Sequence, residues 1–501
     1  MYKLHLIMKY LRKRRIAWVS LVAVTLCTAM VLIVISVMGG WLRMFRSSFH
    51  GLDGDVIVRA ESVAVGFPHY QEMIDKIEKL PEVSAAVPTI ETFGLINIVN
   101  QRRQGVQVVG YPIEKIGEVN NFPESLHRQY DVRKEMIEKE LKEPGLSEEE
   151  RGKLEKELKN PSAPSFALVP GIDYKEIAKD YGFNNPMTRP GMIAGSGLVD
   201  VRKEKDGKLH RPDFINELWA SLTVVPVDPD TSVVNLRGEQ RNTIYWIVDD
   251  SRTQVYQRDS ATVYVPFDQL QKDLSMNEGL PYTDPDTNQK KRDPARTTEI
   301  QIKVKPGVDL NQAKLKIEAC VQEVEQSAGI DSRFPIRVET WEESQAVYLN
   351  AIENEKTLVT MLFSIISLVA VMLILCIFYM IVMEKTKDIG IIKSVGATSS
   401  GVAAIFLGYG AAIGIVGAGL GFLAGFLIVR NINFLHTKFS ELTGHPIWDP
   451  QVYAFDTIPN TMNPHEVAVI LIVAVLASVL GAVIPAIAAA RLHPVESLRW
   501  E

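Results

Sequence analysis

The fold is decided by the stretch EKTKDIGIIKSVGATSSG, Glu384–Gly401, which separates two long apolar runs. The run before it, Leu358–Met383, has no charged residue in 26 positions, and the run after it, Gly401–Val429, has none in 29. About 20 apolar residues are enough to cross a ~30 Å hydrocarbon core. The two runs therefore predict membrane-spanning helices at 358–383 and 401–429, joined by a loop at 384–400. Lysines in this loop place it in the cytoplasm, because positive charge close to a span is retained inside.

The loop itself has the pattern of a short amphipathic helix. Ile389, Ile392 and either Val395 or Gly396 recur at three- and four-residue spacing on one face, while Lys385 and Lys393 lie elsewhere. Gly396 is suited to end the helix, and the hydroxyl of either Thr398 or Ser399 is suited to cap the next one. From the pattern alone two interpretations remain: the apolar face lies in the lipid headgroups, or it docks on a partner protein.

The N-terminal region predicts the first span. Residues 1–15 contain six lysines and arginines, and the uncharged run Ile16–Met38 follows. A cleaved signal peptide is the alternative, but this run is longer than a usual signal core and no A-x-A-like site follows it. A lipid anchor at Cys27 lacks the small residue expected just before it. We therefore predict a span at 16–38, with residues 1–15 in the cytoplasm.

Residues 39–357 predict a large domain with no further span. Trp41–Phe49 continues the helical spacing of the first span, and Trp341–Lys356 predicts a helix running straight into the second. Between them, two β-α-β patterns are expected to share one lobe. The first has strands at 55–59, 83–89 and 105–110 around a helix at 70–80, and the second has strands at 299–304 and 337–340 around a helix at 310–328.

A long insertion separates these two patterns. Residues 130–160 are more than half charged and carry a capping-box pattern at Ser147–Glu150, which predicts a charged helical hairpin. This hairpin is either exposed to solvent or in contact with a partner. Further strands are predicted at 191–197, 243–248 and 261–266.

The C-terminal third predicts tight helix packing in the membrane. Glycines recur at four-residue spacing in the run 401–429, and small residues so placed let helix backbones approach closely in lipid. An external connector is expected at 430–466, a fourth span at 467–490 and a cytoplasmic tail at 491–501. The glycines expected to pack are Gly410, Gly414, Gly417, Gly421 and Gly425.

Composition excludes several classes of function. The net charge of −6 provides no basic surface for nucleic acid, and the three cysteines offer no disulfide framework. The sequence has no Walker A, H-E-x-x-H, C-x-x-C or G-x-S-x-G motif, and its nine histidines have no ligand spacing. We therefore expect no catalytic residues, no metal site and no cofactor bound by this chain.

Two motifs carry a family resemblance. The loop E-K-T-K-D-I-G-I-I-K-S-V-G-A-T resembles the signature loop of the ABC permeases of the MacB, FtsX and LolC/LolE superfamily. The tail P-A-I-A-A-A-R-L-H-P-V-E-S-L-R, which begins at Pro485, is similar to the terminal motif of the same superfamily. The Trp341 region and the strand Val263–Pro266 resemble the LolC/LolE type in particular.

The resemblance implies a membrane protein with four transmembrane α-helices and a large extracytoplasmic α+β domain of MacB type between helices 1 and 2. The chain is then a multi-pass, non-catalytic permease subunit in a bacterial inner membrane, with the large domain in the periplasm. The residues implied in coupling to the ATPase are Glu384, Lys385, Asp388, Ile389, Gly390, Ile392, Lys393 and Gly396. Those of the terminal motif are Pro485, Arg491, Pro494, Glu496, Leu498 and Arg499.

The implied partners are ABC ATPase subunits that bind ATP and Mg²⁺, a second permease in a homo- or heterodimer, membrane lipids, a lipoprotein cargo and a periplasmic carrier. The implied function is release of lipoproteins from the inner membrane by mechanotransmission. MacB-type efflux of small molecules or peptides, and FtsX-type regulation of an external cell-wall hydrolase, remain alternatives.

Overall fold

The structure is a computed structural model that forms two compact units. It describes residues 15–493 except for 63–64, 99–102, 143–146, 160–163, 182–187, 200–201, 204–208, 211–216, 227–239, 254, 280–281, 284–289, 292, 331–334, 445–447 and 449–456. The helical unit comprises Met1–Phe45, Tyr348–Asp449 and Thr457–Glu501, and the sheet unit comprises Arg46–Val347 and Pro450–Asp456.

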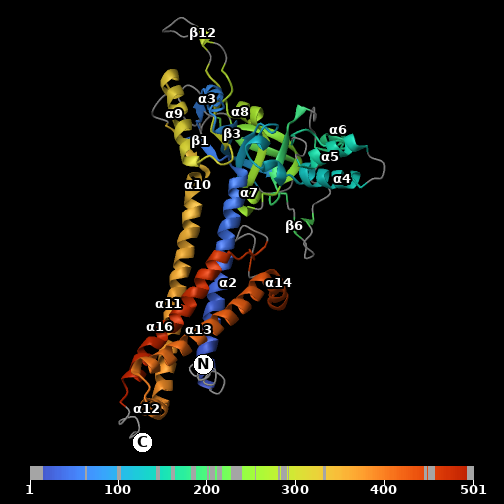
Figure 1. Cartoon of the computed structure of the whole chain (residues 1–501). Coiled ribbons are helices and arrows are strands. Elements are labelled where there is room, and N and C mark those ends of the chain that lie inside the picture. The colour runs from blue at the N-terminus through green and yellow to red at the C-terminus, as the bar shows by residue number, and fades with distance from the viewer. Residues whose placement is uncertain are drawn as a thin grey trace. The chain divides into compact units, whose positions relative to one another are not determined.

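The helical unit is built on four long helices (Figure 1). Over the described part of the chain these four are long and apolar enough to cross a membrane, so the predicted number of spans is confirmed. They are α2 (Arg15–Leu52), α11 (Ala346–Glu384), α13 (Ser399–Arg430) and α16 (Pro464–Arg491). Two shorter helices, α12 (Thr386–Ser394) and α14 (Ile432–Thr443), lie before and after α13 in the chain.

The sheet unit contains a nine-stranded mixed sheet in the order β15-β1-β14-β3-β4-β10-β5-β9-β8. Its strands are β1 (Val56–Ala60), β3 (Val83–Ile98), β4 (Gln104–Tyr111), β5 (Gly191–Gly195), β8 (Trp219–Val224), β9 (Arg241–Ser251), β10 (Thr262–Pro266), β14 (Glu299–Val304) and β15 (Ile336–Thr340). Strand β8 also pairs with β3, through partners such as Leu95 and Thr223. This extra pairing closes six strands, from β3 to β8, into a small barrel.

Alternate residues of the barrel strands separate two cores, as expected where side chains of a closed sheet point alternately in and out. Val106 and Val108 of β4 share one cluster with Met192 and Ala194 of β5. Val109, next to Val108, and Ile193, between Met192 and Ala194, belong to a second cluster, which also includes Trp246 and Tyr264. The barrel is therefore filled by one apolar core and covered on part of its outside by another.

The remaining helices and strands of the sheet unit are shorter. The helices are α3 (Tyr70–Ile77), α4 (Arg133–Glu140), α5 (Glu148–Lys159), α6 (Tyr174–Asp180), α7 (Tyr256–Ala261), α8 (Phe267–Asp273), α9 (Leu310–Ala328) and α10 (Trp341–Ser344), with helical turns at Ile116–Glu118, Phe122–Ser125 and His127–Val132. Three two-stranded pairs join β2 (Phe67–Pro68) to β13 (Arg296–Thr297), β6 (Arg202–Lys203) to β7 (Leu209–His210), and β11 (Tyr282–Thr283) to β12 (Lys290–Lys291).

The two predicted β-α-β patterns do share one lobe. Met73 and Ile77 of α3 and Ile317 and Val321 of α9 lie in one buried cluster with residues of β1, β14 and β15. Helix α9 begins where Asp309 Oδ1 accepts hydrogen bonds from two backbone amides, and it ends at Gly329, whose φ of 64° suits glycine. The predicted charged hairpin corresponds to α4 and α5, joined by an ion pair between Arg133 and Glu157 at 3.0 Å.

The predicted helix from Trp341 to Lys356 is not continuous, which corrects our expectation. Thr340 and Glu343 form a capping box that starts α10, and Gln345 interrupts the helix with φ −98° and ψ 11° before α11 begins. The Gln345 side chain is buried and donates to Asp53 Oδ2 at 3.0 Å, while Arg258 donates to Asp53 Oδ1 at 3.0 Å. Gln345 therefore leaves the helical conformation while its side chain makes a buried hydrogen bond.

A buried carboxylate pair lies in the lobe of the sheet unit. Glu299 on β14 contacts the Arg59 guanidinium, and Arg59 also lies 3.6 Å from Glu91 on β3. Burial and the neighbouring Glu91 carboxylate raise the pKa of Glu299 to about 8, against the opposing attraction of Arg59. Burial and the Glu91 carboxylate thus favour the protonated form of Glu299 in the folded protein.

We predict that this pair makes stability depend on pH. The folded pKa of Glu299 lies above its unfolded value, so its contribution is fully present below about pH 4.5 and is lost as pH rises through about 8. The free energy of unfolding should therefore fall between these values, by at most about 1.4 kcal/mol per pH unit. Glu299→Gln should flatten this dependence, measured as the melting temperature of the full-length protein in detergent from about pH 5 to about pH 9.

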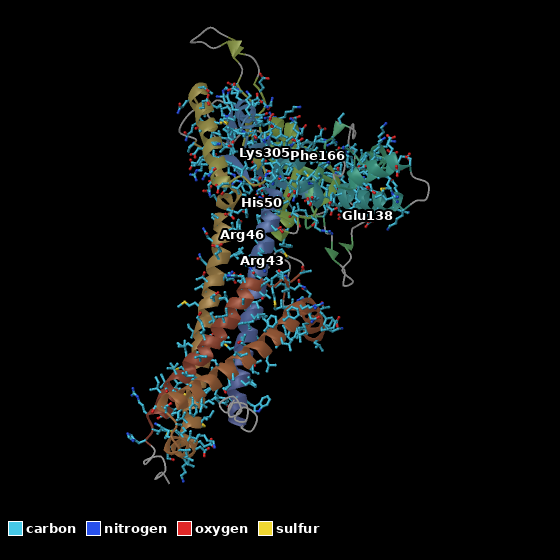
Figure 2. The ribbon with its side chains drawn as sticks, in the orientation of Figure 1. Arg43, Arg46, His50, Glu138, Phe166 and Lys305 are labelled. Atoms are coloured by element: carbon cyan, nitrogen blue, oxygen red, sulfur yellow. The ribbon has the colours of Figure 1, made fainter. Side chains whose placement is uncertain are left out.

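A suitable control is Glu138→Gln, which changes an exposed residue of α4 (Figure 2). This variant should retain the pH dependence of the wild type. An unchanged slope in Glu299→Gln would show that the carboxylate pair holds no extra proton.

Candidate functional site

The loop helix α12 forms where the sequence predicted it. Lys385, between α11 and α12, pairs with Asp388 in the first turn, and Thr386 donates its hydroxyl to the carbonyl of Met383 at 2.8 Å. Gly396 follows the helix with φ 109°, a conformation that favours glycine. Thr398 Oγ1 then accepts from the Gly401 amide at 3.2 Å and caps α13.

The buried and exposed faces of α12 differ from our prediction. Ile389 is only 4% exposed and lies in an apolar cluster with Ile381 and Phe406 of its own bundle. Gly390 is also buried, and Ile392 is half-buried. Of the predicted apolar face, Ile389 thus packs on this chain and is not available to a partner, whereas Gly396 is exposed.

Two apolar residues are exposed, Ile391 on α12 and Val395 at its end, and of these only Val395 was a candidate for the predicted face. Ile391 is 51% exposed and Val395 is 84% exposed, and their four-residue spacing places them on one side of the helix. The periodicity in the sequence contained both sets of residues, but it could not say which set the bundle would cover.

Lys393 joins α12 to the end of α16. Its ammonium donates to the carbonyls of Ala490 at 2.8 Å and Leu492 at 2.7 Å. The last carbonyls of a helix have no partner within it and carry partial negative charge, so a lysine is well suited to this position. Lys393 therefore has a defined intramolecular role, which the loop motif alone did not indicate.

The five glycines of α13 lie against two different helices. A Cβ added at Gly417 or Gly421 would meet Val24 or Thr28 of α2 at 2.8 and 2.7 Å, and Gly425 faces α2 in the same way. A Cβ at Gly410 or Gly414 would instead meet Ala482 or Ser478 of α16 at 2.6 and 2.9 Å. The Ser478 hydroxyl also donates to the carbonyl of Gly410 at 2.8 Å. Close packing of α13 on α2 thus requires the last three glycines, and close packing on α16 requires the first two.

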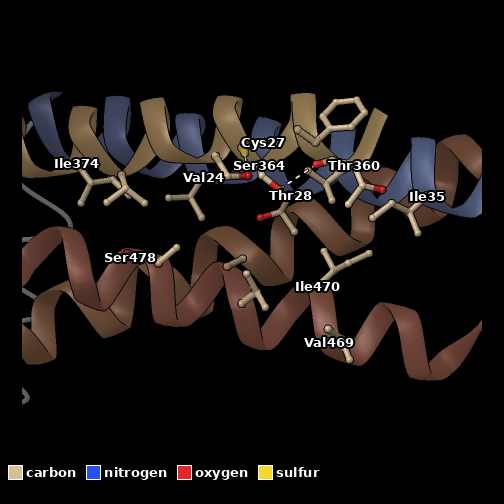
Figure 3. Close-up of a pocket in the computed structure, with 17 residues that line it drawn as sticks. Val24, Cys27, Thr28, Ile35, Thr360, Ser364, Ile374, Val469, Ile470 and Ser478 are labelled. Atoms are coloured by element: carbon tan, nitrogen blue, oxygen red, sulfur yellow. Dashed lines mark hydrogen bonds between the residues drawn. The ribbon is translucent and has the colours of Figure 1, made fainter. Parts of the chain in front are cut away.

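A cavity of about 400 Å³ lies among α2, α11 and α16 (Figure 3). Aliphatic side chains line most of it, and hydroxyl groups of α11 line one side. Ser364 donates to the carbonyl of Thr360 at 2.9 Å, the interaction drawn in Figure 3. The lining residues are Val24, Cys27, Thr28, Val31 and Ile35 of α2, Thr360, Phe363, Ser364, Ser367, Val371 and Ile374 of α11, and Val469, Ile470, Val473, Ala474, Ala477 and Ser478 of α16.

A second cavity, of about 620 Å³, shares Thr360 and Ser364 with the first. Its lining includes the charged residues Glu353 and Lys356 of α11. Lys356 also lies 3.6 Å from Glu466 at the start of α16. The two cavities together thus offer an apolar part and a charged part.

The terminal motif is only partly described. Pro485 is buried inside α16, and Arg491 is the exposed last residue of this helix. The other predicted motif residues, Pro494, Glu496, Leu498 and Arg499, lie outside the described residues, as does the basic segment before residue 15. Within the described part of the chain, no group of three or more His, Cys, Asp or Glu side chains is placed to hold a metal ion.

Comparison with known proteins identifies a domain within the chain. Residues 360–494 match the family model described as FtsX-like permease C-terminal. The lipoprotein-releasing system transmembrane protein LolC of Neisseria meningitidis is 30% identical over 169 residues, which cover 34% of this chain and 41% of that protein. The corresponding LolE of Haemophilus influenzae is 28% identical over 119 residues, covering 24% and 29%.

Two further proteins are similar to parts of this chain. An uncharacterised ABC transporter permease of Methanocaldococcus jannaschii is 31% identical over 124 residues, covering 25% of this chain and 27% of that protein. The crystal structure of the periplasmic region of MacB from Actinobacillus actinomycetemcomitans aligns with 60% of this chain and 94% of its own, with a TM-score of 0.27 and 8% identity. The chain matches less than half the length of each of these sequence relatives.

Proposed function

We propose that this chain, which carries an FtsX-like permease domain at residues 360–494, is the permease subunit of an ABC transporter that releases lipid-anchored proteins from a bacterial inner membrane. In this proposal a separate ATPase binds ATP and Mg²⁺, and a second permease completes the transporter. The sheet unit faces the periplasm, where a carrier receives the cargo. The similarity to LolC and LolE, named for lipoprotein release, supports this choice of cargo.

The observation that carries the proposal is the cavity among α2, α11 and α16. Its volume of about 400 Å³ lies within the range of ligand pockets, roughly 300–1,000 Å³. Its aliphatic lining suits an acyl chain, and the adjoining charged cavity beside Lys356 suits a polar headgroup. An acyl chain gains about 0.8 kcal/mol per buried CH₂ from the bilayer, and a binding site within the membrane must offset this gain.

We further propose that the cargo moves by mechanotransmission. Helix α2 has 38 residues and α11 has 39, so at 1.5 Å per residue each is roughly 57 Å long. This length is nearly twice the ~30 Å hydrocarbon core. Two such helices suit the transmission of a movement across the membrane, because a continuous helix is stiffer than a flexible linker.

The exposed side of the loop helix α12 is the proposed contact with the ATPase. Ile391 and Val395 form this surface, beside the exposed Lys387. Glu384, Lys385 and Asp388 remain part of the proposed coupling loop, and Gly396 provides its turn. Ile389, Gly390, Ile392 and Lys393 hold the loop on the bundle.

The two alternative functions, hydrolase regulation and small-molecule efflux, predict different ligands for the cavity. Regulation of a cell-wall hydrolase requires no acyl-chain site at all. Efflux of small molecules requires a site that binds soluble compounds in preference to acylated ones. A binding experiment with an acylated probe therefore separates the proposal from both.

We predict that filling the cavity prevents binding of an acylated ligand. Ala474 of α16 lines the cavity, and Ala474→Phe places a ring in it. A diacylated lipopeptide carrying a photoreactive group in one acyl chain should label the wild-type protein in vesicles, at residues of α2 and α11. Labelling should fall to background in Ala474→Phe, measured by mass spectrometry of the labelled peptides.

The matched control is Ile472→Phe, which adds a ring at an exposed position of the same helix. This variant should be labelled like the wild type. Labelling of Ala474→Phe at the wild-type level would contradict the assignment of the cavity, and absence of labelling in the wild type would favour efflux or hydrolase regulation.

A further inference from the structure

Helix α14 exposes a row of large apolar side chains within the helical unit. Phe434, Leu435, Phe439 and Leu442 are 64%, 45%, 48% and 86% exposed. At 3.6 residues per turn, these four positions fall within about 140° of the helix circumference. Lys438 lies among them, and a lysine can extend its ammonium to water from such a position.

The opposite side of α14 is polar and is held by this chain. Asn433 Nδ2 donates to the carbonyl of Ile458 at 3.0 Å, and its Oδ1 accepts from the Ile458 amide at 2.9 Å. His436 Nε2 accepts from the Trp448 amide at 3.1 Å. The rotation of α14 about its own axis is therefore fixed, and its apolar row faces away from these contacts.

The length of α13 and its short link to α14 indicate how deep α14 would lie in a membrane. Helix α13 has 32 residues and is roughly 48 Å long, about the thickness of a bilayer with its headgroups. Its last residue, Arg430, is followed by Asn431, and α14 begins at Ile432. Figure 1 shows α14 at the end of α13 that is farthest from α12. The first turn of α14 thus starts at the level of the headgroups.

We propose that α14 is an interfacial helix on the outer side of the membrane that the chain spans. Its apolar row inserts into the lipid there, below the headgroups. The occupant of this surface is lipid rather than protein, because a helix tethered by one residue to a span lies where acyl chains and headgroups meet. A short helix with aromatic and leucine side chains on one side and polar groups on the other is suited to this position. The proposal does not depend on the cargo of the transporter.

Spin labels on the two sides of α14 test the proposal. The three cysteines of the full-length chain are free, so Cys27→Ser, Cys320→Ser and Cys376→Ser provide a background in which Phe439→Cys or Thr437→Cys is labelled. In lipid vesicles the label at 439 should collide more often with oxygen than with a water-soluble nickel complex. The label at 437, on the polar side, should show the reverse. Depth calibration should place the label at 439 about 5–10 Å below the headgroups.

Two outcomes would overturn the proposal. If the label at 439 is as accessible to the nickel complex as the label at 437, the apolar row lies in water. If it is shielded from both reagents, a protein surface, such as a second copy of this chain, covers the row. Should the cysteine-free protein fail to fold, Phe439→Trp and Thr437→Trp in the native background give the same comparison. Because the chain already has seven tryptophans, quenching by lipids brominated on their acyl chains is compared with that of the parent protein, and Phe439→Trp alone should add to it.

Discussion

Gly421→Leu is expected to force α13 away from α2 and to lower the melting temperature of the purified protein. A Cβ at this position would lie 2.7 Å from Thr28 Cβ and 2.8 Å from the carbonyl oxygen of Thr25. The second contact is with backbone, which cannot move aside as a flexible side chain can. Overpacking of this kind costs about 1–3 kcal/mol, and the larger leucine side chain should cost at least as much. Because lipid provides no hydrophobic drive between helices, lost packing is not replaced by another force.

The matched control is Gly419→Leu, two residues away on the same helix. No atom lies within 4 Å of a Cβ added at Gly419, and this glycine is exposed. Both variants replace a glycine in the same helix by the same residue, so differences in helix propensity largely cancel. Thermal unfolding in detergent, followed by size-exclusion chromatography, should show loss of stability in Gly421→Leu alone. Equal melting temperatures for the two variants would argue against close packing of α13 on α2.

The elements of this fold are predictable from sequence because their patterns are local. Uncharged runs longer than a bilayer core identify the four spans, a short apolar run identifies β1, and apolar alternation identifies β14. Closure of the barrel is different, because it depends on pairing between β3 and β8, strands more than 100 residues apart. No local pattern encodes that pairing.

The glycine spacing shows the same limit. It predicted that α13 approaches other helices closely, yet spacing alone cannot identify the neighbours. The structure assigns Gly410 and Gly414 to α16 and the other three glycines to α2. The cavity among α2, α11 and α16 could not be predicted for a related reason. Its lining comes from three separate segments, and the sequence of each segment indicates only an apolar span.

The break at Gln345 and the exposed side of α12 show how tertiary contacts select among local possibilities. The sequence around Trp341 is compatible with a continuous helix, and a buried hydrogen bond to Asp53 accompanies the break. On α12, Ile389 and Ile391 are equally apolar, and only the position of Phe406 and its neighbours decides which one is buried. Coupling to the proposed ATPase should accordingly depend on Ile391, which the pattern did not place on the apolar face, and on Val395, which the pattern did not distinguish from Gly396.

If this chain binds an ATPase as proposed, Val395→Asp is expected to weaken that binding without unfolding the chain. Val395 is 84% exposed, so a carboxylate there meets water in the isolated chain and should leave the melting temperature unchanged. At a protein interface the same carboxylate would be desolvated without a partner, a cost of several kcal/mol. A loss of 2–4 kcal/mol, typical of a central interface residue, corresponds to roughly 30- to 1,000-fold weaker binding. Co-purification of the ATPase and ATP hydrolysis by the complex in vesicles would measure this effect.

Two further variants distinguish this surface from the one first predicted. Val395→Ile keeps an apolar contact and should retain the ATPase. Ile389→Asp places a carboxylate in the apolar cluster around Phe406, so it should lower the melting temperature of the permease alone. If Ile389→Asp is as stable as the wild type and loses the ATPase, while Val395→Asp retains it, the docking surface is the face predicted from the sequence. Loss of the ATPase in Val395→Asp at unchanged stability would instead place the contact on the side of α12 that the bundle leaves exposed.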